Sequence, residues 1–300
     1  MIAEATRAES SGRRLAFRRF HATRFCPRRT TSGLALVTLL LLAPARGADA
    51  APAGDGLAFD YHIYAGGLYA LSLTTRLALD PQAYRIDLDA KVDGLPAVFF
   101  TYNLTARVEG RRDSDGLRPA RYRSANRWRA NRERWVEVEY GPEGPLETRA
   151  DPPLGKDDRK LVPVELRRNT LDPISGVFAL LEGVEDDGRC ASEIAVFDGR
   201  RRYDLIARQI GPAQLQPSAI GVYSGPAIEC RIAVKQVTGF WDKPRMKNRF
   251  PEEIVTFLAT VLEGVPPVPV RLELQNVFGA VVIHLVSYSA NGARTAKVAP

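Results

Sequence analysis

The chain has 300 residues, of which 45% are apolar and 26% are charged, and 42 basic against 35 acidic residues give a formal net charge of +7. Residues 1–50 hold nine basic and three acidic residues, so they account for six of these seven charges. The remainder is nearly neutral and gives no basis for nucleic-acid binding. Its length of about 250 residues is enough to bury a substantial core.

The first 50 residues have the organisation of a secretory leader. An Arg- and Ser-rich stretch (1–33) precedes an apolar run at 34–44, and small residues end at Ala48-Asp49-Ala50. This order predicts a signal peptide cleaved after Ala50 and a periplasmic protein, with 51–56 as a linker. Sec-type export is favoured, and twin-arginine export is the alternative because of the pairs Arg13-Arg14 and Arg28-Arg29. An uncleaved membrane anchor is the alternative, although the run is shorter than the roughly 20 residues of a membrane span.

Alternating apolar and polar residues predict antiparallel strands in the next segment. Apolar residues recur at every second position in 71–79 and in 84–92, and charged residues occupy the other face of the second run. This period is typical of half-buried strands, and the short turns between them predict a meander that begins near residue 57. Residues 94–101 break the period and predict a short apolar connection with one helical turn.

An arginine-rich region follows, with ten arginines against four acids in 107–134. Two interpretations remain open, an anion-binding face and the solvated face of two or three strands. Trp128 and Trp135 lie within or next to this region and are suited to stacking with arginine. The Pro-, Gly- and charge-rich residues 141–158 predict a long loop that separates possible halves, 57–140 and 160–288.

The clearest helix is predicted over Pro173–Glu182. Asp172 is a favourable N-cap, proline suits the first helical position, and Gly183 is placed near the end. Four apolar residues fall at helical spacing and predict a buried stripe: Ile174, Val177, Phe178 and Leu181. Phe178 and Leu181 are candidate ligand contacts if this helix lines a cavity, and contact with lipid is the alternative to a purely structural core.

Two cysteines remain after the predicted leader, which contains Cys26. In an oxidising compartment the simplest use of Cys190 and Cys230 is a disulfide, with two buried free thiols as the alternative. Closing a loop of this size would stabilise the fold by about 3–4 kcal/mol. Asp198-Gly199 between two apolar runs predicts a hairpin turn inside this loop.

The segment 239–253 interleaves aromatic and basic residues. Trp241, Arg245 and Arg249 are therefore candidate contacts to a lipid with an anionic headgroup. The alternative is a solvated hairpin tip whose aromatic rings fold back onto the core. Two more strands are predicted at 268–276 and 279–288, followed by a flexible tail at 289–300.

Four segments resemble one known family. They are TLDPISG at 170–176, VFDGRRRYDL at 196–205, YSGPAIECR at 223–231 and VPVRLE at 268–273. Together they are similar to domain-of-unknown-function family 3108, a group of exported proteobacterial proteins, and the resemblance spans roughly residues 57–288. It implies a periplasmic β-rich domain and carries over no catalytic residues.

Motifs for catalysis are scarce. GVYSG at 221–225 does not have the spacing of a nucleophile elbow, and the chain after residue 50 contains only His62 and His284. We therefore expect no metal and no cofactor. The expected function is noncatalytic binding or scaffolding of an apolar or lipid ligand or of an envelope protein. An envelope hydrolase or transferase with an unrecognised active site is the alternative.

The predicted fold is mainly β in a single domain, 57–288. The apolar sides of the runs at 71–79, 84–92, 228–234 and 281–285 need cover, and the sequence supplies few helices. We therefore expect a curved antiparallel sheet, or a half-open to closed β-barrel, with one or two covering helices.

Overall fold

The computed structural model describes residues 56–99, 101–129, 132–156, 159–241, 251–276, 279–290 and 293–294. These residues form one 14-stranded sheet, one α-helix and two 3-10 helices. The first meander contains β1 (Leu57–Ala65), β2 (Leu68–Leu79), β3 (Ala83–Val92), η1 (Leu95–Val98), β4 (Asn103–Asp113), β5 (Gly116–Arg129), β6 (Arg132–Gly141) and β7 (Gly144–Asp151). After η2 (Val164–Arg167) and α1 (Pro173–Asp187) come β8 (Ala191–Phe197), β9 (Arg202–Leu215), β10 (Gly225–Thr238), β11 (Glu253–Ala259), β12 (Val268–Asn276), β13 (Gly279–Ala290) and β14 (Ala293–Arg294).

The sheet is built from two meanders that meet at the chain's first and last long strands. Its order is β7-β6-β5-β4-β3-β2-β1-β13-β12-β11-β10-β9-β8, and β14 pairs with β13. The ladder between β1 and β13, like the others between the named strands, is antiparallel. β7 and β8 are the two edges and do not pair with each other, so the sheet stays open. The prediction of a mainly β, curved antiparallel sheet is confirmed, in its unclosed form.

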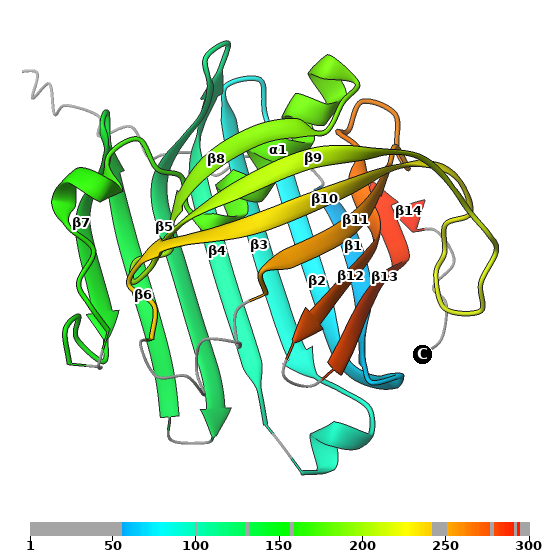
Figure 1. Ribbon diagram of the computed structural model, residues 1–300, viewed down its shortest axis with the longest axis horizontal. Coiled ribbons are helices and arrows are strands. Elements are labelled where there is room, and N and C mark those ends of the chain that lie inside the picture. The colour runs from blue at the N-terminus through cyan, green and yellow to red at the C-terminus, as the bar shows by residue number, and fades with distance from the viewer. Residues whose placement is uncertain are drawn as a thin grey trace, which may run out of the picture. The chain divides into compact units, whose positions relative to one another are not determined.

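The sheet curls until its two arms face one another. Figure 1 shows β8, β9 and β10 crossing in front of β3 to β6, with α1 behind them. Gly199, in the turn between β8 and β9, has φ 88°, and a Cβ added there would lie 3.0 Å from Cβ of Val136 in β6. Glycine is needed at this point because the turn requires a positive φ and lies directly against the side chains of Val136 and Val138.

The predicted helix exists, but it is longer than expected and turned differently. The side chain of Asp172 accepts hydrogen bonds from the backbone N–H groups of Ile174 and Ser175, and the helix runs past Gly183 to end before Gly188, which has φ 63°. Phe178 (4% exposed) and Leu181 (8%) are buried as predicted, whereas Val177 is 44% exposed and Ile174 is only partly buried.

The error on Val177 has a geometric cause. Phe178 packs towards Tyr84 on β3, with ring centroids 6.3 Å apart, whereas Leu180 and Leu181 join a second apolar cluster beside the disulfide. Because α1 has a wall of sheet on each of two sides, its buried surface is not one stripe. Leu180, which the single-stripe pattern omitted, is 2% exposed.

Residues 141–158 were predicted to be a long loop, and this was wrong. β6 continues to Gly141, and β7 pairs with it from Gly144. The pattern was missed because β7 is an edge strand with few buried residues, and Leu146 is 76% exposed. β13 also continues to Ala290 and pairs with β14, so strand structure extends into the predicted tail.

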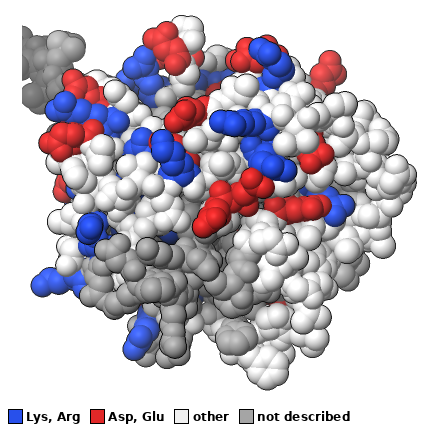
Figure 2. Space-filling model, viewed as in Figure 1, with Lys and Arg blue, Asp and Glu red and all other residues white. Residues whose placement is uncertain are grey.

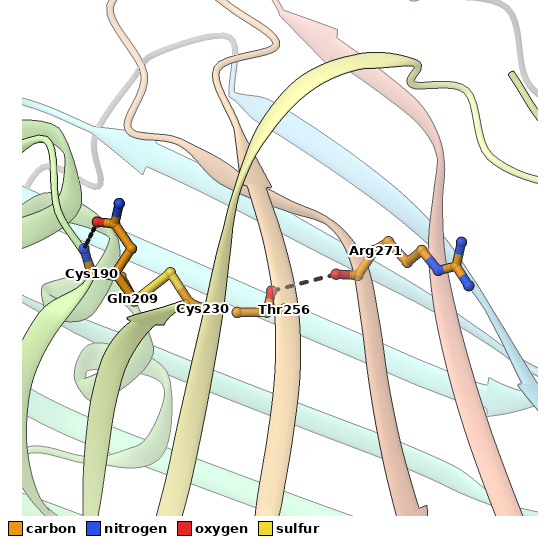
Figure 3. The surroundings of a disulfide bond; sticks show 5 residues. All are labelled: Cys190, Gln209, Cys230, Thr256 and Arg271. Carbon is orange, nitrogen blue, oxygen red and sulfur yellow. Dashed lines mark hydrogen bonds between the residues drawn. A yellow bond between two sulfur atoms is a disulfide. The ribbon is translucent and has the colours of Figure 1, made fainter. Parts of the chain in front are cut away.

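The predicted disulfide joins Cys190 and Cys230, whose Cα atoms are 6.0 Å apart. Both residues are fully buried, and Oε1 of Gln209 accepts a hydrogen bond from the backbone N–H of Cys190 at 3.3 Å (Figure 3). The bond connects the end of α1 to β10. It therefore holds the helix to the arm of the sheet that crosses the first meander.

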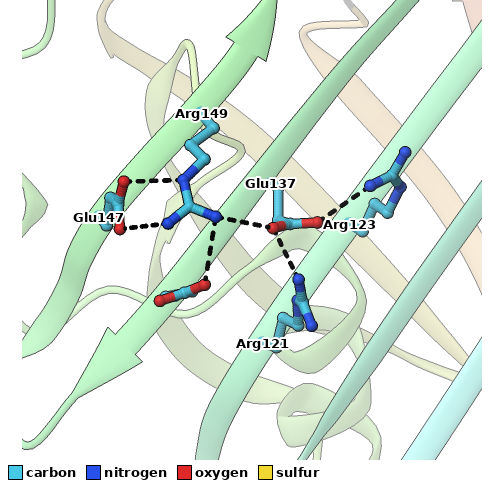
Figure 4. A network of polar contacts seen from close by, with 6 residues as sticks. Arg121, Arg123, Glu137, Glu147 and Arg149 are labelled. Carbon is cyan, nitrogen blue, oxygen red and sulfur yellow. Dashed lines mark hydrogen bonds and ion pairs between the residues drawn. The ribbon is translucent and has the colours of Figure 1, made fainter.

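The outward face of the first meander is covered with paired charges. Figure 4 shows the carboxylate of Glu137 between Arg121 and Arg123, at 2.8 and 3.0 Å, with Arg149 bridging to Glu147. Figure 2 shows both signs of charge interspersed on another face of the molecule as well. The arginine-rich region 107–134 thus contributes largely to a solvated, ion-paired strand face, the second of the two interpretations considered.

Candidate functional site

A cavity of about 490 Å³ lies where the β8–β9 turn meets the first meander. Its walls come from the start of β4, the second half of β5, the start of β6, the β8–β9 turn and the residues after β10. The lining comprises Tyr102, Leu104, Tyr122, Ser124, Asn126, Arg134, Trp135, Val136, Arg159, Pro173, Asp198, Arg200, Arg201, Tyr203, Phe240 and Trp241. A volume of this size suits a small-molecule ligand.

The β8–β9 turn forms one wall and is held rigidly by Asp198. Its Oδ1 accepts hydrogen bonds from the backbone N–H groups of Arg200 (2.9 Å) and Arg201 (2.7 Å), and its Oδ2 accepts one from Nε of Arg201 at 2.6 Å. Arg200 also donates from Nη2 to the carbonyl of Pro152 at 2.5 Å. The turn thus presents two guanidinium groups, one held by the carbonyl of Pro152 and the other by the carboxylate of Asp198.

Aromatic rings form the second component of the cavity. The ring of Phe240 lies 6.4 Å from Tyr203 in an edge-on arrangement and 5.8 Å from the guanidinium carbon of Arg201. The guanidinium of Arg159 lies 4.7 Å above the ring of Trp241. Such contacts fix flat apolar surfaces next to positive charge.

Burial changes the protonation of the cavity's polar groups. Burial, reinforced by the carboxylate of Asp198, raises the pKa of both Tyr122 and Tyr203. Burial lowers the pKa of Arg201, but the carboxylate of Asp198 together with the neighbouring tyrosines has the larger combined effect, and the pKa is raised. At neutral pH the cavity therefore contains phenols that can donate hydrogen bonds and a guanidinium that stays charged.

A second group of buried polar residues lies at the start of α1. Asp172 is fully buried, and burial raises the pKa of its carboxyl to about 6. The hydroxyls of Tyr84 and Ser175 are 2.8 Å apart. Pro173, the first residue of the helix, lines the cavity, so this polar group supports the cavity wall from behind.

The structure separates the residues that the sequence suggested as ligand contacts. Trp241 lines the cavity, whereas Phe178 and Leu181 lie in the core and do not line it. Arg245 and Arg249 lie outside the described residues. A role for these side chains in ligand binding stays a prediction.

Most of the cavity wall was not predicted. Tyr122, Ser124 and Asn126 alternate on the inward face of β5, a pattern hidden by the many arginines of this strand. Asp198 was recognised only as a turn residue. The sequence does contain a signal, because every second residue of β5 and β6 belongs to the inward face. These residues form a cavity wall only because the β8–β9 turn crosses over the two strands.

Neither histidine belongs to the cavity. His62 and His284 face each other across β1 and β13, and burial lowers the pKa of His284. Within the described part of the chain, no group of three or more His, Cys, Asp or Glu side chains is arranged to hold a metal ion. In the same residues no helix is long and apolar enough to span a bilayer.

The fold and the site together define a class of protein: an open, curled antiparallel sheet wrapped around one helix, with a cavity between its arms. A family model for proteins of unknown function, DUF3108, matches residues 60–286, and the chain belongs to this family. The match confirms the resemblance drawn from the four sequence segments.

A crystal structure of a beta-barrel-like protein of the domain-of-unknown-function family DUF1849, from Brucella abortus, is similar with a TM-score of 0.48 and 12% identity. The similarity covers 80% of this chain and 99% of that one. None of the curated proteins compared matches the chain.

Proposed function

We propose that this protein is an exported, periplasmic binding protein that takes up an amphiphilic ligand with an anionic group. The observation that carries the proposal is the cavity between the two arms of the sheet, where arginines and aromatic rings form one lining. An anionic headgroup matches the guanidinium groups of the β8–β9 turn, and an apolar body matches the rings of Phe240 and Trp241.

The composition of the cavity favours binding over catalysis. Arg201 is already paired with Asp198 in a geometry fixed by the backbone, and the neighbouring phenols stay protonated. Such groups are suited to hold a charged ligand. Among the described lining residues the candidate general base is Asp198, and its carboxylate is already occupied by three hydrogen bonds.

The proposal of export rests on the leader, residues 1–50, and on the buried cysteine pair. We expect N-terminal sequencing of the exported protein to begin at Ala51. A protein that begins at Met1 would contradict this part.

Native mass spectrometry of protein purified from its own periplasm tests the ligand. We expect a bound amphiphile of defined mass in the wild type and its loss in Ser124→Phe, because a phenyl group on the inward face of β5 fills the cavity. Thr105→Phe, on an exposed outward position of β4, is the matched control and should keep the ligand. Equal occupancy in both variants, or an empty wild type that turns over an envelope substrate, would reject the proposal.

A further inference from the structure

The connection between β3 and β4 exposes an unusual amount of apolar surface. Leu95 is 73% exposed, Val98 75% and Phe99 78%, and η1 buries none of its residues. The strand β2 contacts η1, and its first residue, Leu68, is 60% exposed. Large apolar side chains that gather in this way mark an interaction surface more often than a solvated loop. In Figure 1 η1 projects below the strands, and the corresponding tip of Figure 2 is uncharged.

The loop is firmly attached at its base, so the exposure is not that of a frayed segment. The backbone N–H of Val92 donates to the carbonyl of Tyr102 at 2.9 Å, and Asp93 bonds to the carbonyl of Ala70 at 2.9 Å. The hydroxyl of Tyr69 donates a hydrogen bond to the carboxylate of Asp93 at 3.2 Å. The backbone N–H of Gly94, assisted by this hydroxyl, lowers the pKa of the Asp93 carboxyl. The stem is ordered by polar contacts, and its apolar tip is held away from the core.

Basic side chains lie near the base of the tip. Lys91 and Arg127 lie in one cross-strand row through Asn103, and Arg132 lies at the neighbouring hairpin. Among the described residues, neither Lys91 nor Arg132 takes part in an ion pair, while the nearby acid Glu133 is paired with Arg127. The acids at the other end of the same strands are partly neutralised, because Arg118 pairs with both Asp113 and Asp115 at 3.0 Å.

We propose that the η1 tip is a peripheral membrane-docking surface. Leu95, Val98 and Phe99 enter the interface of a bilayer, and Lys91 and Arg132 lie at the level of anionic headgroups. A bilayer is the favoured occupant because the tip is a single convex turn with three outward apolar side chains, whereas a protein partner would need a matching groove. The adjacent positive charges fit an anionic lipid surface.

Docking at this end has a consequence for the cavity. Tyr102 closes the stem of the tip and also lines the cavity, and the β8–β9 turn lies at the same end of the sheet. A docked protein would bring its cavity to the membrane that supplies or receives an amphiphile. Membrane docking goes beyond the proposed ligand binding, and the two can fail separately.

Vesicle co-sedimentation of the exported protein tests the docking surface. The probe is a vesicle of phosphatidylcholine with phosphatidylglycerol, compared with phosphatidylcholine alone. We expect the triple variant Leu95→Ser, Val98→Ser, Phe99→Ser to bind at least tenfold more weakly than the wild type, because it removes the apolar groups that enter the interface. Leu146→Ser, Leu161→Ser, Val164→Ser is the matched control, since these residues are also exposed, and it should bind like the wild type.

Charge and ligand occupancy complete the test. Lys91→Glu with Arg132→Glu should weaken binding to the anionic vesicles at least tenfold and change little on the neutral ones. The tip variant should keep its cavity ligand in native mass spectrometry, whereas Ser124→Phe should lose the ligand and still bind vesicles. Wild type that does not sediment, or a tip variant that sediments like the wild type with an unchanged circular dichroism spectrum, would overturn the proposal and favour a protein partner at the tip.

Discussion

Arginine pairs with a carboxylate in two different settings, on the outward face of the sheet and in the β8–β9 turn. On the outward face Arg76 pairs with Asp89 at 2.7 Å, and both side chains are more than half exposed. In the β8–β9 turn Arg201 pairs with Asp198 at 2.6 Å, and the carboxylate is only 8% exposed. Solvent screens the first pair more than the second, in which the Arg201 side chain is 32% exposed. The second pair should therefore contribute more to the free energy of unfolding. Burial therefore decides how much each arginine–carboxylate pair contributes to the free energy of unfolding.

The largest effect is expected where the helix fills the concave face. Phe178→Ala removes a ring from the core and should lower the free energy of unfolding by about 3–5 kcal/mol. Val177→Ala, one residue away on the exposed side of α1, should cost less than about 1 kcal/mol. Urea denaturation with the disulfide intact measures both values. Similar losses in the two variants would show that α1 does not separate an inner and an outer side.

The two arginine pairs should differ in their contribution to stability. Arg201→Ala should cost about 3 kcal/mol, because it leaves the buried carboxylate of Asp198 with two backbone donors and no countercharge. Arg76→Ala should cost less than about 1 kcal/mol. The same denaturation series tests both. If 0.5 M salt weakens the Arg201 pair as much as the Arg76 pair, the inner pair is screened and the comparison fails.

A smaller effect should appear in the pH dependence of stability. Burial raises the pKa of Asp172 to about 6, so the folded state binds this proton more tightly than the unfolded chain. The resulting stabilisation is present at acidic pH and is lost as the pH rises. Between pH 4.5 and 7.5 the loss should be about 2 kcal/mol. Asp172→Asn, which can still cap the helix, should remove this slope.

Glu137 on the outward face should behave in the opposite way. Its hydrogen bond from Arg121, assisted by Arg123, lowers the pKa of Glu137, so its contribution is present near neutral pH and is lost only as the pH falls below the usual glutamate range. Glu137→Gln should therefore flatten the acid side of the stability curve and leave the region from pH 5 to pH 7 unchanged. Difference curves against the wild type that slope in the same direction for both variants would contradict this assignment.

Local patterns were enough to predict much of this protein. The alternation in 84–92 predicts β3, because a half-buried strand needs one apolar side whatever covers it. Asp172 and Pro173 predict the start of α1, since capping involves only neighbouring backbone groups. The pairing of Cys190 with Cys230 followed from an even count of cysteines outside the predicted leader. Membership of DUF3108 was also recognisable from four short segments.

The tertiary structure decided the remaining features, because they depend on groups far apart in the chain. β7 is an exposed edge strand, and Val177 is exposed only because α1 lies between two walls. The cavity exists because Gly199 lets the β8–β9 turn pack on Val136, more than 60 residues earlier in the chain. The sequence determined which residues form strands and a helix. Only the curl of the sheet determined which of its arginines and aromatic rings meet in one cavity.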